Sequence, residues 1–122
     1  MKYDKQLRVL LIAVILASAL AYIAATGLKS LFQVPRPCEL IDTCPDSFSF
    51  PSRQTSIAFA VATVFALVTR KKHYSIAAFA LAALVGYWRI SLGVHTIYDI
   101  IGGVVVGVGV GYVVYYILKS IP

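Results

Sequence analysis

Charged residues are scarce in this chain of 122 residues, and acidic residues are especially few. Asp, Glu, Lys and Arg together make up 13% of the sequence, and only five residues are acidic. Apolar residues reach 60% and the mean hydropathy is +0.84, well above the values of an ordinary soluble domain. The composition favours an integral membrane protein, and the length allows one domain, residues 1–122.

Several other absences narrow the choice of function. The net charge is +6, but the basic residues cluster at the ends of apolar runs, so no nucleic-acid partner is expected. No charge lies midway through an apolar run, which leaves a small transporter without support. The chain has two cysteines, Cys38 and Cys44. Their C-x5-C spacing is a weak zinc signal, and we expect no metal site.

The apolar residues fall into four segments, and a membrane span needs roughly 20 of them. We predict an all-α bundle of four transmembrane helices, at about 7–28, 54–69, 73–89 and 97–118, with an outer loop at 29–51. The first and last segments are long enough by themselves, whereas the middle two borrow flanking residues. Two alternatives stay open: a signal peptide for the first segment and a re-entrant hairpin for the middle pair.

The basic residues predict the orientation of this bundle. Seven of them fall on the N-terminal side of a four-span arrangement: Lys2, Lys5, Arg8, Arg70, Lys71, Lys72 and Lys119. The positive-inside rule makes that side cytoplasmic, so we predict a multi-pass protein of the cell membrane with both termini in the cytoplasm. Only Lys29, Arg36, Arg53 and Arg89 remain for the extracytoplasmic face.

The predicted outer loop contains both cysteines. A disulfide between Cys38 and Cys44 is plausible in an oxidising exterior and would stiffen this proline-rich loop. Two free thiols are the alternative.

The last apolar segment contains a stripe of small residues. Gly103, Gly107 and Gly111 recur every four residues, a pattern that lets helices approach closely. The stripe either packs the bundle internally, which we favour, or mediates a homodimer.

One charged motif interrupts the apolar sequence near the start of the last segment. Arg89, His95 and Asp99 follow the spacing R-x5-H-x3-D. On a helix, residues four apart share one face, so the Asp99 carboxylate can hold the His95 imidazole. A lone carboxylate one turn inside an apolar helix is costly, which makes a functional role the default. A nearby guanidinium suits an oxyanion such as phosphate.

Two further motifs are predicted to lie on the same extracytoplasmic face. Lys29 and Arg36 follow the pattern K-x6-R-P, and Pro51-Ser52-Arg53-Gln54 begins the second apolar segment. Converging cations would clamp an anion, and Ser52 at a helix start offers a hydroxyl beside free backbone N–H groups. Each has an ordinary alternative: Lys29 as a snorkelling lysine, Ser52 as a plain N-cap and His95 as an interfacial histidine.

In order and spacing, the three motifs resemble the signature of the phosphatidic acid phosphatase type 2 superfamily, K-x6-RP, PSGH and SR-x5-H-x3-D. The matching residues are Lys29, Arg36, Pro37, Pro51, Ser52, Arg89, His95 and Asp99. Membrane members typically have six spans, and this chain resembles the motif-bearing four. The resemblance implies hydrolysis without metal or cofactor. It also implies that His95 attacks phosphorus, Asp99 orients its ring, Lys29, Arg36 and Arg89 bind the phosphoryl oxygens, and Ser52 completes the cradle.

Three positions depart from this pattern. Trp88 replaces a serine, and Arg53 replaces a glycine and could add a phosphate contact. Gln54 replaces the histidine that serves the family as general acid, and an amide cannot supply a proton. Gln54 has three interpretations: preference for a lipid diphosphate, an engineered inactivating change, or a member that binds without turnover.

The resulting hypothesis is a lipid phosphatase at the outer face, acting on a polyprenyl phosphate or diphosphate. Phosphatidic acid or phosphatidylglycerol phosphate is the second choice of substrate. A non-enzymatic membrane module, either a lipid-binding pseudophosphatase or a helix-packing protein, is the alternative class. The expected partners are the lipid substrate and the surrounding bilayer, with a homodimer as a further possibility.

Overall fold

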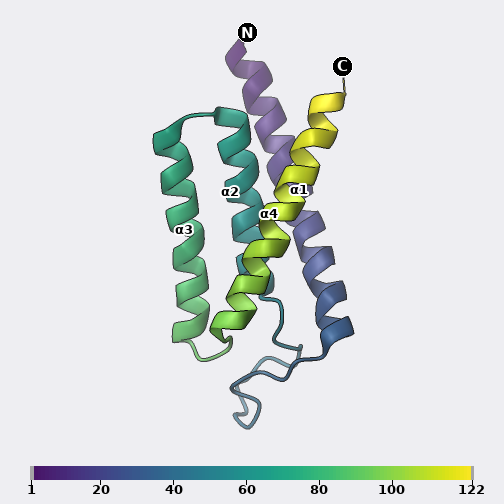
Figure 1. Ribbon diagram of the computed structural model, residues 1–122, viewed down its shortest axis with the longest axis vertical. Helices are drawn as coiled ribbons and strands as arrows, with labels where there is room; N and C mark the ends of the chain where they lie inside the picture. Colours follow the sequence, from purple (N-terminus) through teal and green to yellow (C-terminus); the bar gives the residue numbers. More distant parts are fainter. Residues whose placement is uncertain (1, 122) are drawn as a thin grey trace.

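The computed structural model describes residues 2–121 and contains four α-helices (Figure 1). They are α1 (Lys2–Phe32), α2 (Arg53–Thr69), α3 (Lys72–Ser91) and α4 (Ile97–Ser120). No strand occurs among these residues. The predicted all-α fold is confirmed.

Three of the helices, α1, α3 and α4, are long and apolar enough to cross a membrane. The apolar α2 has 17 residues, at the lower limit of roughly 17 for a span. Helix α3 reaches 20 residues because it extends beyond its apolar stretch at both ends. Exposed side chains along the bundle are largely apolar, for example Ile15 at 68% and Val105 at 68%. A belt of this kind suits lipid as the surrounding medium.

Helix α2 is the centre of the bundle and packs against each of the other three helices. Helix α1 also contacts α4, whereas α3 packs mainly on α2 (Figure 1). Both chain termini lie at one end of the bundle, which we name the terminal end. The long connection between α1 and α2 and the short turn between α3 and α4 lie at the opposite end, the loop end.

Two stripes of small residues bring the helices together. On α1, the fully buried alanines Ala13, Ala17, Ala21 and Ala25 repeat every four residues. On α4, a Cβ atom added to Gly103 or Gly111 would lie 2.8 Å or 2.6 Å from the Cβ atoms of Thr55 and Thr63 in α2. The glycine stripe therefore packs α4 against α2, as the favoured internal interpretation predicts.

Each stripe reaches a charged residue at the loop end. Four residues beyond Ala25 comes Lys29, and four residues before Gly103 comes Asp99. Both charged side chains consequently point into the bundle and are buried. The packing faces of α1 and α4 thus position two of the predicted site residues.

The loop end is fastened by a disulfide and by backbone hydrogen bonds. Cys38 and Cys44 are bonded, with 5.5 Å between their Cα atoms, which confirms the predicted pairing. The Ser49 N–H donates to the Val34 carbonyl at 2.8 Å, and the Ser52 N–H donates to the Asp99 carbonyl at 3.0 Å. The second bond ties the start of α2 to the first turn of α4.

Candidate active site

The predicted nucleophile, His95, lies in the turn before α4 and is 2% exposed. Its Nδ1 is 3.2 Å from Asp99 Oδ2, and its Nε2 is 3.2 Å from Arg36 Nη1. A guanidinium can only donate hydrogen bonds, so Nε2 accepts and the ring proton belongs on Nδ1, facing the carboxylate. The ring is thereby oriented with the Nε2 lone pair toward the cations.

Asp99 is 1% exposed and receives several hydrogen bonds at one oxygen. Besides His95, Oδ2 accepts from the Thr96 backbone N–H at 2.8 Å and from the Ser49 hydroxyl. The Thr96 hydroxyl in turn accepts from the Asp99 N–H, which completes a capping box at the start of α4. These contacts offset the cost of burying the carboxylate and restrict its rotation.

Arg36 is held by the loop in a fixed orientation. Its Nε donates to the Ser47 carbonyl at 2.8 Å, Nη2 donates to the Ser47 hydroxyl at 2.9 Å, and Nη1 donates to the Val94 carbonyl at 3.0 Å. Burial, followed by the neighbouring Arg89, lowers the pKa of Arg36 from its usual 12.5, while Asp99 opposes the shift. An arginine remains charged under all ordinary conditions.

Lys29 and Arg89 complete the basic surroundings. Lys29 is 3% exposed, and its Nζ donates to the Phe48 carbonyl at 2.7 Å and to the Ser49 carbonyl at 3.4 Å. This geometry contradicts the snorkelling alternative, since Lys29 points inward. Arg89 lies 5.1 Å from the Trp88 ring, and its Nε is buried without a hydrogen-bond partner in the described chain. An unpaired guanidinium N–H here is a donor suited to an anion.

The Pro51-Ser52-Arg53-Gln54 segment is divided between the cluster and its surroundings. Ser52 is fully buried and caps α2 by accepting from the Thr55 N–H at 3.3 Å, so the N-cap interpretation holds. Arg53 reaches the Tyr22 hydroxyl at 2.8 Å and the Ser47 hydroxyl at 3.4 Å. Gln54 is exposed, and no hydrogen bond joins it to the cluster within residues 2–121.

The burial of His95 determines its protonation. Desolvation comes first and the charge of Arg36 second; together they lower its pKa from 6.5 to about 4, although the hydrogen bond to Asp99 opposes them. The imidazole is therefore neutral at pH 7. Only a neutral imidazole has a free electron pair, so the ring is in the form that a nucleophile requires.

Sequence reasoning missed two residues of this cluster, Ser47 and Ser49. Ser47 accepts from both Arg36 and Arg53, and the fully buried Ser49 donates to Asp99. Serines in a loop have no periodicity that distinguishes them from ordinary polar residues. The role of Thr96 was readable, because Thr-x-x-Asp before an apolar run indicates a capping box.

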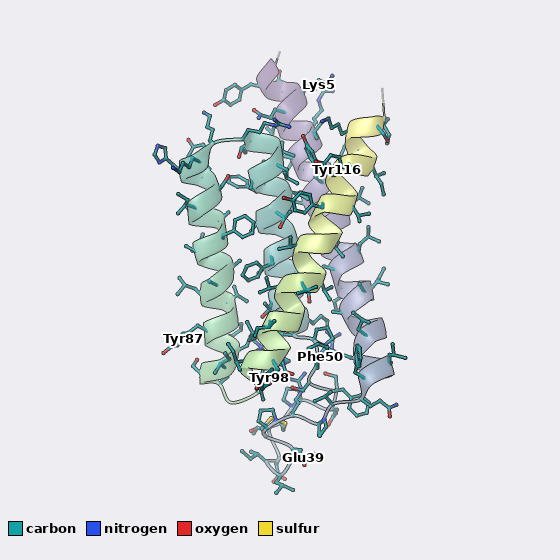
Figure 2. All side chains as sticks on the ribbon, in the orientation of Figure 1. Lys5, Glu39, Phe50, Tyr87, Tyr98 and Tyr116 are labelled. Carbon is teal, nitrogen blue, oxygen red and sulfur yellow. A yellow bond between two sulfur atoms is a disulfide. The ribbon has the colours of Figure 1, made fainter. Side chains whose placement is uncertain are left out.

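The side chains of the loop end thus form one cluster below the helices, near the labelled Phe50 and Tyr98 (Figure 2). The family pattern of the PAP2 superfamily matches residues 9–121. The chain belongs to the PAP2 superfamily. The match covers more than nine tenths of the sequence and includes all three motifs.

Two solved structures share the fold and the sequence. The PAP2-type phosphatidylglycerolphosphate phosphatase from Bacillus subtilis superposes with a TM-score of 0.75 at 30% identity, covering 91% of this chain and 60% of that one. The LpxE protein of Aquifex aeolicus gives a TM-score of 0.71 at 34% identity, covering 85% of this chain and 66% of that one.

Two Porphyromonas gingivalis proteins are similar in sequence. Its lipid A 4'-phosphatase is 40% identical over 68 residues, and its lipid A 1-phosphatase is 39% identical over 71 residues. These alignments cover 56% and 57% of this chain but only 29% and 16% of the relatives. The chain therefore matches under a third of either curated relative.

Proposed function

We propose that this PAP2 member is a membrane lipid phosphatase that hydrolyses a phosphate or diphosphate ester at the loop end of the bundle. The observation that carries the proposal is the geometry of His95, whose Nδ1–H faces Asp99 and whose Nε2 faces Arg36. A neutral imidazole with its lone pair directed toward buried cations is arranged to attack an anionic phosphorus centre.

The proposed reaction has two steps. The substrate phosphate takes the Arg36 donor away from Nε2, and the freed lone pair attacks phosphorus. A P–N bond forms, the P–O bond to the lipid breaks, and the leaving oxygen takes the electron pair. Asp99 stabilises the positive ring of the phosphohistidine through Nδ1–H, and water then cleaves the P–N bond to regenerate His95.

The cations supply most of the stabilisation in this scheme. Lys29, Arg36 and Arg89 bind the equatorial oxygens of the transferring group, where negative charge is spread in the transition state. Arg89 is suited to this role because its buried Nε has no protein partner among the described residues. Ser52 shapes the cradle through the first turn of α2, and Arg53 adds positive charge at its edge.

The leaving group is the weaker half of the site. Gln54 occupies the general-acid position, and it is exposed. A lipid alkoxide leaves poorly without a proton, whereas a phosphate leaving from a diphosphate is already stable as an anion. This asymmetry favours a lipid diphosphate, with a polyprenyl diphosphate as the first candidate.

The relatives support lipid phosphate esters more broadly. Their names specify lipid A and phosphatidylglycerolphosphate, which are anionic headgroups on membrane lipids. Phosphatidylglycerol phosphate and phosphatidic acid therefore remain the second choice for this chain. The distribution of basic residues favours an extracytoplasmic loop end with both termini in the cytoplasm.

Phosphate release from a panel of lipids tests the proposal. The purified chain in neutral-lipid nanodiscs should release phosphate from at least one of polyprenyl diphosphate, polyprenyl phosphate, phosphatidic acid and phosphatidylglycerol phosphate. His95→Ala should abolish release, and His73→Ala, which removes the chain's other histidine, should leave it unchanged. Equal inertness toward the whole panel, or unchanged turnover in His95→Ala, would refute the enzyme hypothesis.

Gln54 supports a second candidate, a PAP2 protein that binds lipid phosphates without turning them over. Vanadate, which mimics the transferring phosphoryl group, distinguishes the two. Tight vanadate binding without phosphate release from any substrate would favour the binding protein.

A further inference from the structure

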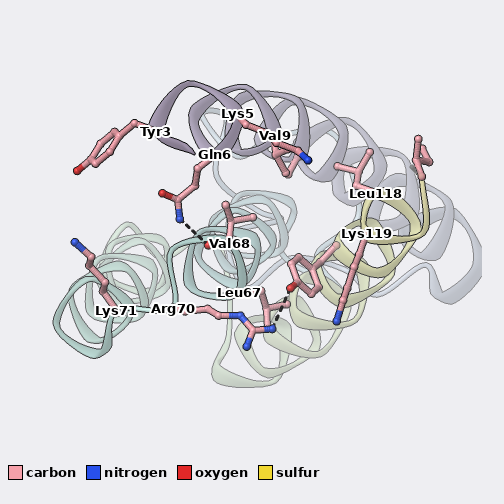
Figure 3. A pocket seen from close by; sticks show the side chains of 13 residues that line it. Tyr3, Lys5, Gln6, Val9, Leu67, Val68, Arg70, Lys71, Leu118 and Lys119 are labelled. Atoms are coloured by element: carbon pink, nitrogen blue, oxygen red, sulfur yellow. Dashed lines mark hydrogen bonds between the residues drawn. The ribbon is translucent and has the colours of Figure 1, made fainter. Parts of the chain in front are cut away.

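The terminal end of the bundle contains a pocket of about 630 Å³ between α1, α2 and α4 (Figure 3). Its inner wall is apolar and includes Val9, Ala13 and Leu118. Its rim carries four cations: Lys5, Arg70, Lys71 and Lys119. No acidic residue is among its lining residues in the described chain. The pocket therefore combines an apolar interior with a strongly basic mouth.

The pocket forms because the small-residue stripes end there. Continuing toward the terminal end, the alanine stripe of α1 gives way to Val9 and Lys5, and the glycine stripe of α4 gives way to Tyr115 and Lys119. These larger side chains cannot enter a close helix contact, so α1 and α4 separate toward their terminal ends (Figure 1). Fully buried Ala13 marks where the close packing begins.

Two of the rim cations are held beside the pocket by specific contacts. Arg70 ends α2 in a left-handed conformation (φ 55°), and its Nη2 donates to the Tyr115 hydroxyl at 3.2 Å. The Lys119 Nζ lies 6.0 Å from the centre of the same ring. Figure 3 shows Arg70 and Lys119 approaching this tyrosine from opposite sides. The tyrosine thus gathers positive charge over the apolar interior.

Membrane orientation alone does not account for this arrangement. The positive-inside rule asks for cations near the helix ends, and Arg8 and Lys72 satisfy it without lining the pocket. A cavity that reaches the core and is closed by cations requires a different reason. Basic pockets between transmembrane helices are suited to anionic lipid headgroups, since the charges pair with phosphate while the walls accept acyl chain.

We propose that this pocket binds an anionic phospholipid of the leaflet at the terminal end. The phosphate lies among Lys71, Lys119 and Arg70, and an acyl chain lies along Val9 and Ala13. The site is at the opposite end of the bundle from His95, and it is independent of the proposed phosphatase activity.

Lipid binding to the full chain tests the proposal. The His95→Ala protein, in neutral detergent so that no substrate is turned over, is titrated with phosphatidylglycerol, phosphatidylcholine or inorganic phosphate, and binding is followed by native mass spectrometry and by the melting temperature. We expect phosphatidylglycerol to bind and to raise the melting temperature. Phosphatidylcholine should bind at least tenfold more weakly, and inorganic phosphate should not displace the lipid.

Matched variants locate the binding. Lys71→Gln with Lys119→Gln removes two rim cations and should weaken binding about 30-fold, from roughly fivefold per cation. Arg8→Gln with Lys72→Gln removes two charges from the same end outside the pocket and should change it less than threefold. Val9→Trp fills the interior, keeps every charge, and should also abolish binding.

Three results would overturn the proposal. Equal losses in the two charge pairs would show unspecific attraction to the basic end. Unchanged binding in Val9→Trp would show that no acyl chain enters. Displacement of the lipid by millimolar phosphate would show a site for free anions.

Discussion

Arg36 Nη1 lies 3.2 Å from His95 Nε2, the ring nitrogen on the far side from Asp99. The contact sets the tautomer, because Nε2 must accept the guanidinium hydrogen. It also gives Arg36 two roles in sequence: it donates to the ring in the free site and to the substrate phosphate once that arrives. The nucleophile is therefore exposed when the anion is in place.

The first prediction concerns pH. The pKa of His95 is lowered to about 4, so lowering the pH protonates Nε2 and removes the nucleophile only near pH 4. We expect no loss from His95 titration around pH 6.5, where an ordinary histidine titrates. NMR titration of 15N-labelled histidine in the His73→Gln protein, whose only histidine is His95, measures this pKa directly. A midpoint near 6.5 would contradict the buried neutral ring.

The same shift predicts how stability depends on pH. An unfolded chain takes up a proton on His95 near pH 6.5, whereas the folded chain does so only near pH 4. Stability should therefore fall as the pH drops from about 6.5 to 4 and should show no further His95 contribution below that. Melting temperatures of wild type and His95→Gln measured across this range isolate the effect, because the variant should lack this contribution.

The second prediction concerns Ser49. Its hydroxyl donates to Asp99, and a hydrogen bond to a charged group contributes roughly 1.5–3 kcal/mol. Ser49→Ala should lower kcat by about 10- to 100-fold with little change in KM, since Asp99 acts on the ring rather than on bound substrate. Ser91→Ala is the control, because that exposed hydroxyl bonds to the Trp88 carbonyl of its own helix. Equal effects of the two variants would exclude a positioning role for Ser49.

The third prediction concerns the leaving group. Gln54→His should raise kcat on lipid monophosphates by about 10²- to 10⁴-fold, the usual contribution of a general acid. Diphosphates should gain much less, because their leaving group needs no proton. Gln33→His, at another exposed glutamine of the loop end, controls for an added imidazole. Equal gains on both substrate types would contradict the assignment of position 54.

The fourth prediction concerns helix packing. A Cβ atom at Gly107 would meet the Ser56 carbonyl and lie 2.8 Å from Phe59 Cβ, whereas at Gly109 nothing lies within 4 Å. Gly107→Ala should cost about 1–3 kcal/mol of stability, as overpacking does, and should reduce activity by displacing Asp99. Gly109→Ala should be neutral or stabilising by up to about 1 kcal/mol. Melting temperatures of the two variants give the comparison, and similar values would contradict close packing on α2.

Much of the fold was predictable because membrane helices obey simple rules. The four apolar segments gave the helices, the four-residue spacing of Gly103, Gly107 and Gly111 indicated internal packing, and the C-x5-C spacing indicated the disulfide. The pairing of His95 with Asp99 followed from helical geometry alone.

Other contacts were beyond sequence reasoning because they depend on how the loop folds. Nothing in the order of residues 33–52 shows that Ser47 holds Arg36 or that Ser49 reaches Asp99. Lys29 was ambiguous for a related reason. Taken alone, it resembles any lysine at a helix end, and only its register with Ala25 shows that it points inward. The basic pocket was equally hidden, because its cations have an adequate explanation in membrane orientation.

The two stripes have a consequence for how this chain tolerates length changes. Asp99 follows the same four-residue register as Gly103, Gly107 and Gly111, and one residue of an α-helix turns the axis by about 100°. A single insertion in α4 between Asp99 and Gly103 would therefore turn the carboxylate away from His95 while the glycines stayed against α2. An insertion of four residues would nearly restore the angle but move Asp99 about 6 Å along the helix. The spacing between the helix contact and the chemistry is thus fixed in both rotation and length, whereas the exposed part of the loop near Glu39 has no such constraint.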